Sequence, residues 1–230
     1  MMIYAILLLI IVGVAGFAVQ SRLKSVFDKY SKVMSPNGMT GAELAEKMLH
    51  DHGIYNVKVT HVKGHLTDHF NPVTMTVNLS DQVYSSRTAA AAAVACHECG
   101  HAVQHAVGYG PIKMRSRLVP IVSVASRMSS FVLMIGMVML FVNQNPVFCY
   151  IGIALLAMTA IFSLVTLPVE YNASERALAW LESSGTLKGE ALEGARESLS
   201  WAARTYVVAA LSAIATLLYY LLMVLSARRD

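Results

Sequence analysis

The chain has 230 residues, of which 56% are apolar and 14% are charged, against about 45–50% and about 25% in ordinary soluble domains. The apolar excess excludes an intrinsically disordered chain, and 14 Gly and 6 Pro are too few for a collagenous or low-complexity one. The net charge of +4 comes mostly from Lys and Arg beside the apolar blocks, which favours contact with anionic lipid over nucleic-acid binding. The sequence therefore predicts an integral membrane protein, mostly α-helical, with a small polar domain.

Four apolar blocks are long enough to cross a bilayer, which takes about 20 helical residues. We predict transmembrane helices over residues 1–21, 118–142, 147–169 and 205–227. The first is expected to remain in the protein as an anchor, because its positive residues follow the apolar block, whereas a cleaved signal peptide begins with them. Residues 143–146, Asn-Gln-Asn-Pro, are expected to form the loop between the second and third helices.

The four crossings place both polar stretches, residues 22–117 and 170–204, on one face of the membrane. Lys and Arg near the ends of the crossings are more numerous on that face, and such an excess favours the cytoplasm. Arg228 and Arg229, on the opposite face, count against this orientation. We expect a multi-pass protein of the cell membrane whose polar domain lies in the cytoplasm.

The first polar stretch has the pattern of a small α+β domain. Residues 40–43, Thr-Gly-Ala-Glu, match a capping box and open a helix that Gly53 is expected to end. Residues 54–62 and 73–79 alternate in the manner of strands, the second strictly. Residues 68–72 have the composition of a turn.

Helices are predicted in both polar stretches. An Ala-rich helix is expected over residues 87–107, with Ser85 or Ser86 as its cap. In the second polar stretch, residues 170–182 continue the helix of the third crossing. Residues 189–204 then form an amphipathic helix that leads into the last crossing.

The Ala-rich helix contains the sequence His-Glu-Cys-Gly-His at residues 97–101, an HExxH motif. At about 100° per residue, His97 and His101 project from one face of the helix, one turn apart. This spacing lets both imidazoles bind one tetrahedral Zn²⁺. Glu98 lies about 100° around the helix from His97, where a general base for the attacking water is expected.

A catalytic zinc site needs a third protein ligand and an open position for water. His105 is one turn further along the helix and is better placed to line a groove or support a ligand. Glu170 directly follows an uncharged crossing, and it is the candidate for the third ligand. Ser174, four residues later on the same helical face, is placed to hydrogen-bond a liganding His. With four crossings, Glu170 lies on the same side of the membrane as His97 and His101, as a shared site requires.

Several longer segments carry a family resemblance that runs through most of the chain, namely residues 68–72, 77–80, 94–105, 167–174 with 176–177, and 205–207. In them the chain resembles the bacterial YugP-type membrane zinc metallopeptidases, a neutral zinc metallopeptidase family. More distantly it resembles the gluzincins, which include the CAAX prenyl protease and heat-shock membrane proteases. The resemblance implies zinc held by His97, His101 and Glu170, with Glu98 as base. The distant relatives have Asp where Ser174 stands.

These observations predict a small α+β zincin-like catalytic domain with an HExxH helix, in a membrane-embedded, zinc-dependent peptidase. Residues 73–79 are expected to be a sheet edge that pairs with an extended substrate, with Asn78 reaching toward the peptide. The alternative is a zinc-stabilised membrane scaffold or adaptor that binds partners without cleaving them. Glu98 argues against it, because a structural zinc site needs no base and closes its fourth position.

The remaining residues that could carry chemistry or contacts have simpler explanations. Cys96 and Cys99 form a CxxC pattern, but they face away from His97 on the helix, and we interpret them as small buried hydrophobic residues. The expected partners are a polypeptide substrate and the lipid bilayer. The small residues Gly136 and Ala154 would also allow a homo-oligomer. The sequence leaves open the identity of the substrate and the choice between endopeptidase and exopeptidase.

Overall fold

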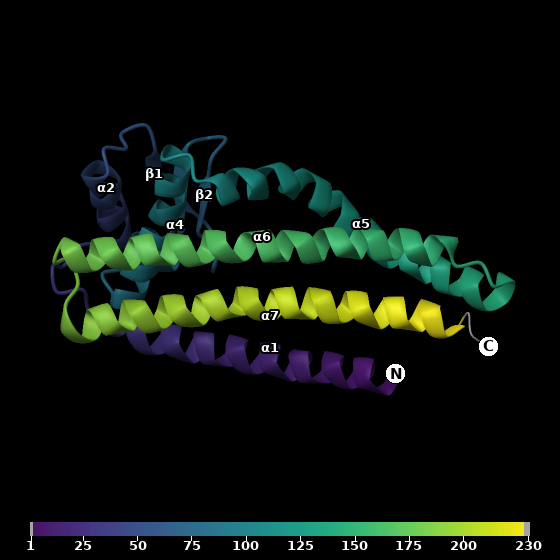
Figure 1. Ribbon diagram of the computed structural model, residues 1–230. Helices are drawn as coiled ribbons and strands as arrows, with labels where there is room; N and C mark the ends of the chain where they lie inside the picture. Colours follow the sequence, from purple (N-terminus) through teal and green to yellow (C-terminus); the bar gives the residue numbers. More distant parts are fainter. Residues whose placement is uncertain (1, 228–230) are drawn as a thin grey trace. The chain divides into compact units, whose positions relative to one another are not determined.

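The computed structural model describes residues 2–227, and this part of the chain is mostly helical (Figure 1). Four of its helices are long and apolar enough to cross a membrane, which confirms the predicted number. They are α1 (Met2–Tyr30), α5 (Gly110–Asn143), α6 (Val147–Ser183) and α7 (Gly189–Ala227).

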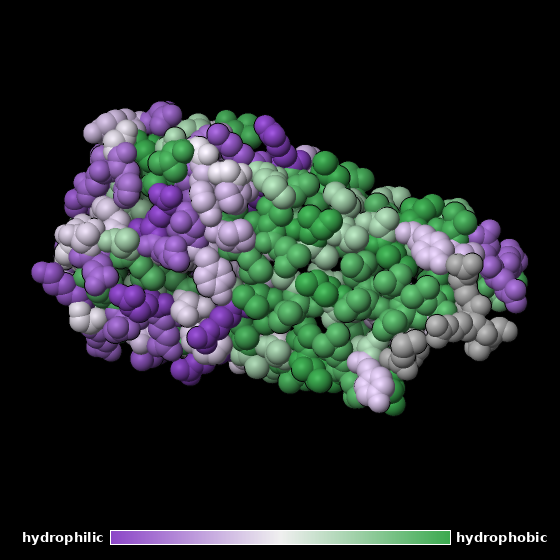
Figure 2. All heavy atoms as spheres, in the orientation of Figure 1, coloured by the Kyte–Doolittle hydropathy of each residue, from purple (hydrophilic) through white to green (hydrophobic). Residues whose placement is uncertain are grey.

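The chain folds as two compact units. The apolar unit contains Met114–Leu167 together with the residues up to Val19 and from Thr205 onward, and the polar unit contains Gln20–Lys113 and Pro168–Arg204. Large apolar side chains gather on the surface of the long helices (Figure 2). Exposed apolar surface of this extent and length is suited to lipid contact.

The polar unit contains a three-stranded sheet with the order β1-β3-β2. Its strands are β1 (Lys58–Val62), β2 (His69–Asn71) and β3 (Thr76–Ser80). β1 runs parallel to β3, and β2 runs antiparallel to it. Three further helices complete this unit: α2 (Gly41–Asp51), α3 (Asp81–Tyr84) and α4 (Ala89–Ala106). The core lies where the apolar face of α2 meets the buried alanines of α4.

The caps of α2 and α4 show how well local patterns locate helix ends. The hydroxyl of Thr40 accepts from the N–H of Glu43 at 3.2 Å, and the Glu43 carboxylate accepts from the N–H of Thr40 at 2.7 Å, so the predicted capping box is confirmed. At α4 the prediction is wrong, because the cap is Thr88, whose hydroxyl accepts from the N–H of Ala91 at 3.3 Å. Thr88 has the extended backbone that precedes a helix, whereas Ser85 and Ser86 lie before it.

The strand predicted over residues 73–79 begins only at Thr76. Its first residues form the turn of a hairpin instead. The side-chain oxygen of Asn71 accepts from the N–H of Val73 at 2.9 Å, and Met75 takes a positive φ of 53°. An Asn that binds the backbone two residues later starts a turn. β2 consequently occupies the residues where only a turn was expected.

The prediction that residues 73–79 form a sheet edge is also wrong. β3 is the central strand, paired with β1 on one side and with β2 on the other. Its backbone N–H and C=O groups are therefore used within the sheet and cannot pair with an added strand. The edges of this sheet are β1 and β2.

Candidate metal centre

Two of the residues singled out by the HExxH motif face each other on α4. The rings of His97 and His101 have centroids 4.8 Å apart and are nearly perpendicular, at 80°. They lie one turn apart on an unbroken helix that begins at Ala89, as a spacing of four residues dictates. His101 is buried, and His97 is partly buried.

α6 brings a carboxylate to these two rings. Glu170, of which 1% is exposed, places Oε2 at 3.2 Å from Nε2 of His97 and at 3.5 Å from Nε2 of His101. One ligand atom from each of the three side chains lies within 4.8 Å of the others. The structure thus brings together His97, His101 and Glu170, the three residues that sequence analysis selected as ligands.

A glycine inside the motif allows this approach. A Cβ at Gly100 would lie 2.5 Å from the carbonyl oxygen of Ala173 on α6 and 3.0 Å from its Cα. Because these are backbone atoms, no side chain can move aside to make room. Gly100 therefore lets α4 and α6 touch through their backbones, which keeps Glu170 within reach of both imidazoles.

Hydrogen bonds at the far nitrogens orient the rings. Nδ1 of His97 lies 3.1 Å from the hydroxyl of Ser174, and Nδ1 of His101 lies 3.1 Å from the amide oxygen of Gln104. Gln104 is fully buried, and its NH₂ group donates to the carbonyl of Val169 at 2.7 Å. A carbonyl only accepts, so the amide oxygen of Gln104 must face the His101 ring.

The orientation of the Gln104 amide fixes the tautomer of His101. The amide oxygen accepts a proton from Nδ1, so Nε2 of the neutral ring presents a lone pair toward Glu170. Two imidazole nitrogens and a carboxylate oxygen form a donor set that suits zinc. The residues present thus fit a transition-metal ion.

Glu98 lies beside this group and is held by the sheet. Its Oε2 accepts from the backbone N–H of Phe70 in β2 at 3.0 Å, and its side chain is partly buried. Phe70 pairs with Val77 of β3, and its N–H is directed away from that strand to Glu98. The carboxylate is therefore placed where α4 meets the free edge of β2.

The structure does not bring the other two candidates into the same group. His105 is exposed, and its ring lies 5.8 Å from that of Phe70. The amide of Asn78 is used within the sheet, where its oxygen accepts from the Thr60 hydroxyl at 2.7 Å and its NH₂ lies 3.2 Å from Nε2 of His69. Among the described residues, neither candidate hydrogen-bonds to His97, His101 or Glu170.

The two thiols of the CxxC pattern are buried in the core. Burial raises the pKa of both Cys96 and Cys99 well above the ordinary value. The thiol of Cys99 donates to the carbonyl of Ala45 on α2 at 3.5 Å. Neutral, buried thiols suit packing rather than metal binding, which requires the thiolate.

The chain matches known proteins over nearly its whole length. Residues 4–225 match the family described as "Putative neutral zinc metallopeptidase". The chain belongs to this family. The chain is also similar to the "Putative membrane protease YugP" of Bacillus subtilis (strain 168), to which it is 40% identical over 215 residues, or 94% of each chain. No solved structure matches the chain. Membership in a zinc metallopeptidase family agrees with the donor set found here.

Gln104 was not among the site residues predicted from the sequence, and we expect it to position the candidate ligand His101. Leucine has a volume similar to that of glutamine. In the variant Gln104→Leu, Nδ1 of His101 loses the amide oxygen that accepts from it, and the carbonyl of Val169 loses the hydrogen bond from the amide NH₂. Loss of such outer partners typically weakens metal binding by about 10–100-fold. Titration of the purified protein with zinc against a competing chelator measures this change. The exposed Gln82 supplies a control, Gln82→Leu, and equal zinc affinities in the two variants would contradict the assignment.

Proposed function

We propose that this protein is a membrane-embedded, zinc-dependent peptidase. The observation that carries the proposal is the convergence of His97, His101 and Glu170 to within 4.8 Å, with Glu98 adjacent on α4. Three protein ligands leave one position of a tetrahedral ion open for water, as in catalytic zinc sites. In this proposal the three convergent residues hold zinc in a zincin-like domain, and Ser174 and Gln104 orient the two imidazoles.

In the proposed hydrolysis, the zinc ion and Glu98 have separate roles. When bound, zinc lowers the pKa of water toward about 7 and polarises the scissile carbonyl. Glu98 accepts the proton of the attacking water and passes it to the leaving amine. The hydrogen bond from Phe70 holds the Glu98 carboxylate beside the metal ligands in the resting protein. A bound water would compete with this backbone N–H for Glu98.

The sheet offers one edge next to Glu98. Because β3 is central, an extended substrate would add to β2, whose free side carries the Phe70 N–H. Strand addition uses the backbone of the substrate and is therefore tolerant of its sequence. We assign to β2 the role that sequence analysis gave to residues 73–79. Asn78 then acts indirectly, by bonding His69 within the same sheet.

The long helices indicate where the reaction takes place. Four helices are long and apolar enough to cross a membrane, and the relative in Bacillus subtilis is named a membrane protease. The excess of Lys and Arg beside the predicted crossings favours a cytoplasmic position for the polar unit. The proposed substrates are polypeptides accessible at the cytoplasmic face of the cell membrane.

Removal and return of the metal tests the proposal. The purified full-length protein, loaded with zinc, is expected to cleave denatured casein. Dialysis against a chelator should abolish cleavage, and one equivalent of zinc should restore it, because the proposed water activation depends on the ion. Cleavage that persists after complete removal of metal would contradict the mechanism. A protein that binds one zinc ion tightly and cleaves nothing would instead support the scaffold or adaptor.

A further inference from the structure

A cavity of about 310 Å³ lies in the polar unit, outside the group formed by the metal-ligand candidates. It is enclosed by α1, by the segment before β2, by α4 and by α7. Pockets that bind small ligands have volumes of about 300–1,000 Å³, so the cavity is large enough to hold one. Most of its wall is apolar, with side chains from Leu23, Phe27, Leu66, Val94, Leu199 and Ala202.

The cavity and the candidate metal centre share two elements. Val94 precedes His97 by three residues on α4, which is about 4.5 Å along the helix axis and about 60° around it. Leu66 precedes Phe70 by four residues, and the N–H of Phe70 donates to Glu98. The cavity and the candidate metal centre are thus built on adjoining residues of α4 and of the segment that leads into β2.

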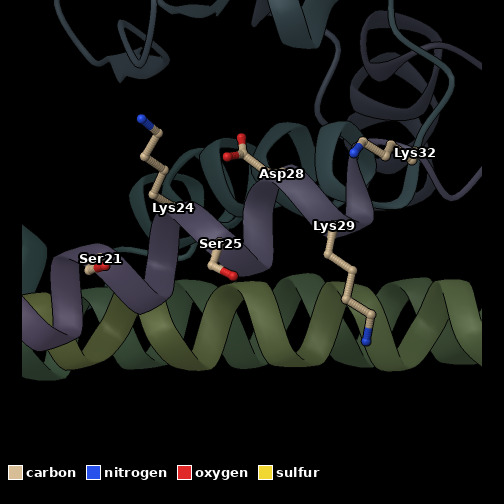
Figure 3. Close-up of a pocket in the computed structure, with 6 residues that line it drawn as sticks. All are labelled: Ser21, Lys24, Ser25, Asp28, Lys29 and Lys32. Carbon is tan, nitrogen blue, oxygen red and sulfur yellow. The ribbon is translucent and has the colours of Figure 1, made fainter.

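The charges at the rim of the cavity cancel. Lys24 and Asp28 both line it, and Figure 3 shows them on the same side of α1. Lys29 points to the other side of the helix (Figure 3) and donates to the hydroxyl of Tyr30 at 3.0 Å. A rim that carries one side chain of each charge gives no net attraction for a phosphate or an anionic headgroup. The occupant that fits this cavity is apolar and uncharged.

The hydroxyl of Ser198, in the wall of the cavity, favours a peptide over a lipid tail as the apolar occupant. Ser198 lines the cavity, and its hydroxyl is buried without a hydrogen-bond partner among the described residues. A buried hydroxyl is expected to find a partner. The methylenes of a lipid tail provide none, whereas the backbone of a peptide brings an N–H or a C=O together with each apolar side chain.

We propose that this cavity receives an apolar side chain of the polypeptide substrate. The inference rests on the proposed peptidase function and adds the substrate class, namely extended segments with a large apolar residue at one fixed position from the cleaved bond. Two of the walls, from α1 and α7, continue helices that belong to the apolar unit. The residues that select the substrate thus flank the predicted membrane crossings.

The test compares cleavage sites in denatured casein, mapped by mass spectrometry. The zinc-loaded full-length protein in lipid nanodiscs is expected to cut beside large apolar residues. Phe27→Ala enlarges the cavity and should shift the preference toward Trp and Tyr. Ala202→Phe narrows it and should shift the preference toward Ala and Val. For each variant, the ratio of cleavage beside the newly favoured residues to cleavage beside the residues that the wild type prefers should change by about tenfold. A change of this size is expected when a side-chain pocket gains or loses volume. Tyr55→Ala removes an exposed aromatic residue outside the cavity and should leave the profile unchanged.

Four results would overturn the inference. Cleavage sites without an apolar residue at any fixed position, or identical profiles for the wild type and both cavity variants, would do so while the peptidase function stands. A phospholipid bound by the wild type and lost from Ala202→Phe, with an unchanged profile, would assign the cavity to lipid. Absence of cleavage by the zinc-loaded wild type would overturn the proposed function and this inference together. Because ratios are compared within each variant, a lower stability does not mimic the expected shifts.

Discussion

Glu98→Gln is expected to lower the rate of casein cleavage by about 10²–10⁴-fold, the usual contribution of general acid–base catalysis, while zinc remains bound near one ion per chain. The amide is neutral and cannot accept the proton of the attacking water. Its oxygen can still accept from the N–H of Phe70, the bond that holds Glu98 in place at 3.0 Å. The substitution therefore removes the base without moving the side chain. Rates are measured by release of peptides, and bound zinc by elemental analysis of the same sample.

Glu175→Gln supplies a matched control for this experiment. Glu175 is an exposed residue of α6, so the same chemical change at this position should leave both the rate and the zinc content unaltered. Cleavage by Glu98→Gln at the wild-type rate would defeat the proposed mechanism. Loss of zinc together with activity would assign Glu98 to the ligands and leave the base unidentified.

Glu170→Gln is expected to abolish cleavage by a different route, the loss of the metal. A neutral amide oxygen is a poorer ligand for zinc than a carboxylate, because the negative charge of the carboxylate attracts the cation. Outer partners alone typically contribute about 10–100-fold to metal affinity, so we expect zinc binding to weaken by more than about 100-fold. The chelator titration used for Gln104 measures this loss. Addition of excess zinc should restore part of the activity.

The two glutamate variants thus separate two roles that sit on neighbouring helices. Glu98→Gln should bind zinc but not cleave casein. Glu170→Gln should cleave casein only to the extent that added excess zinc occupies the weakened site. Thermal unfolding of the metal-free proteins serves as the control for folding, because neither substitution changes the side-chain volume much. Wild-type zinc affinity in Glu170→Gln would remove Glu170 from the ligand set and with it the observation on which the proposed function rests.

Features that depend on local spacing could be predicted from the sequence. The four apolar helices follow from block length alone. The capping box at Thr40 follows from four neighbouring residues. The facing imidazoles follow from a spacing of four on a helix. Glu170 was selected by a topological argument, and its carboxylate lies next to both rings.

Other features that depend on partners far apart in the chain were not predicted. The order β1-β3-β2 places the strongest alternating strand in the centre of the sheet, and an alternating pattern does not reveal how many neighbours a strand has. Gln104 lies three residues after His101 and could have been noticed on the same helical face. Its role, however, depends on the carbonyl of Val169, which is distant in sequence. A sequence motif specifies side chains, so it does not reveal which backbone carbonyls accept a hydrogen bond.

The contact between Gly100 and Ala173 also changes what counts as the motif in this protein. HExxH treats the third and fourth letters as interchangeable, but here the fourth letter faces a neighbouring backbone at a distance that no Cβ tolerates. A side chain at this position is excluded by a steric neighbour and not by the chemistry of hydrolysis. Within this protein, the five-residue signature therefore carries four selective letters instead of three, and a homologue with a bulkier residue there must separate its two helices.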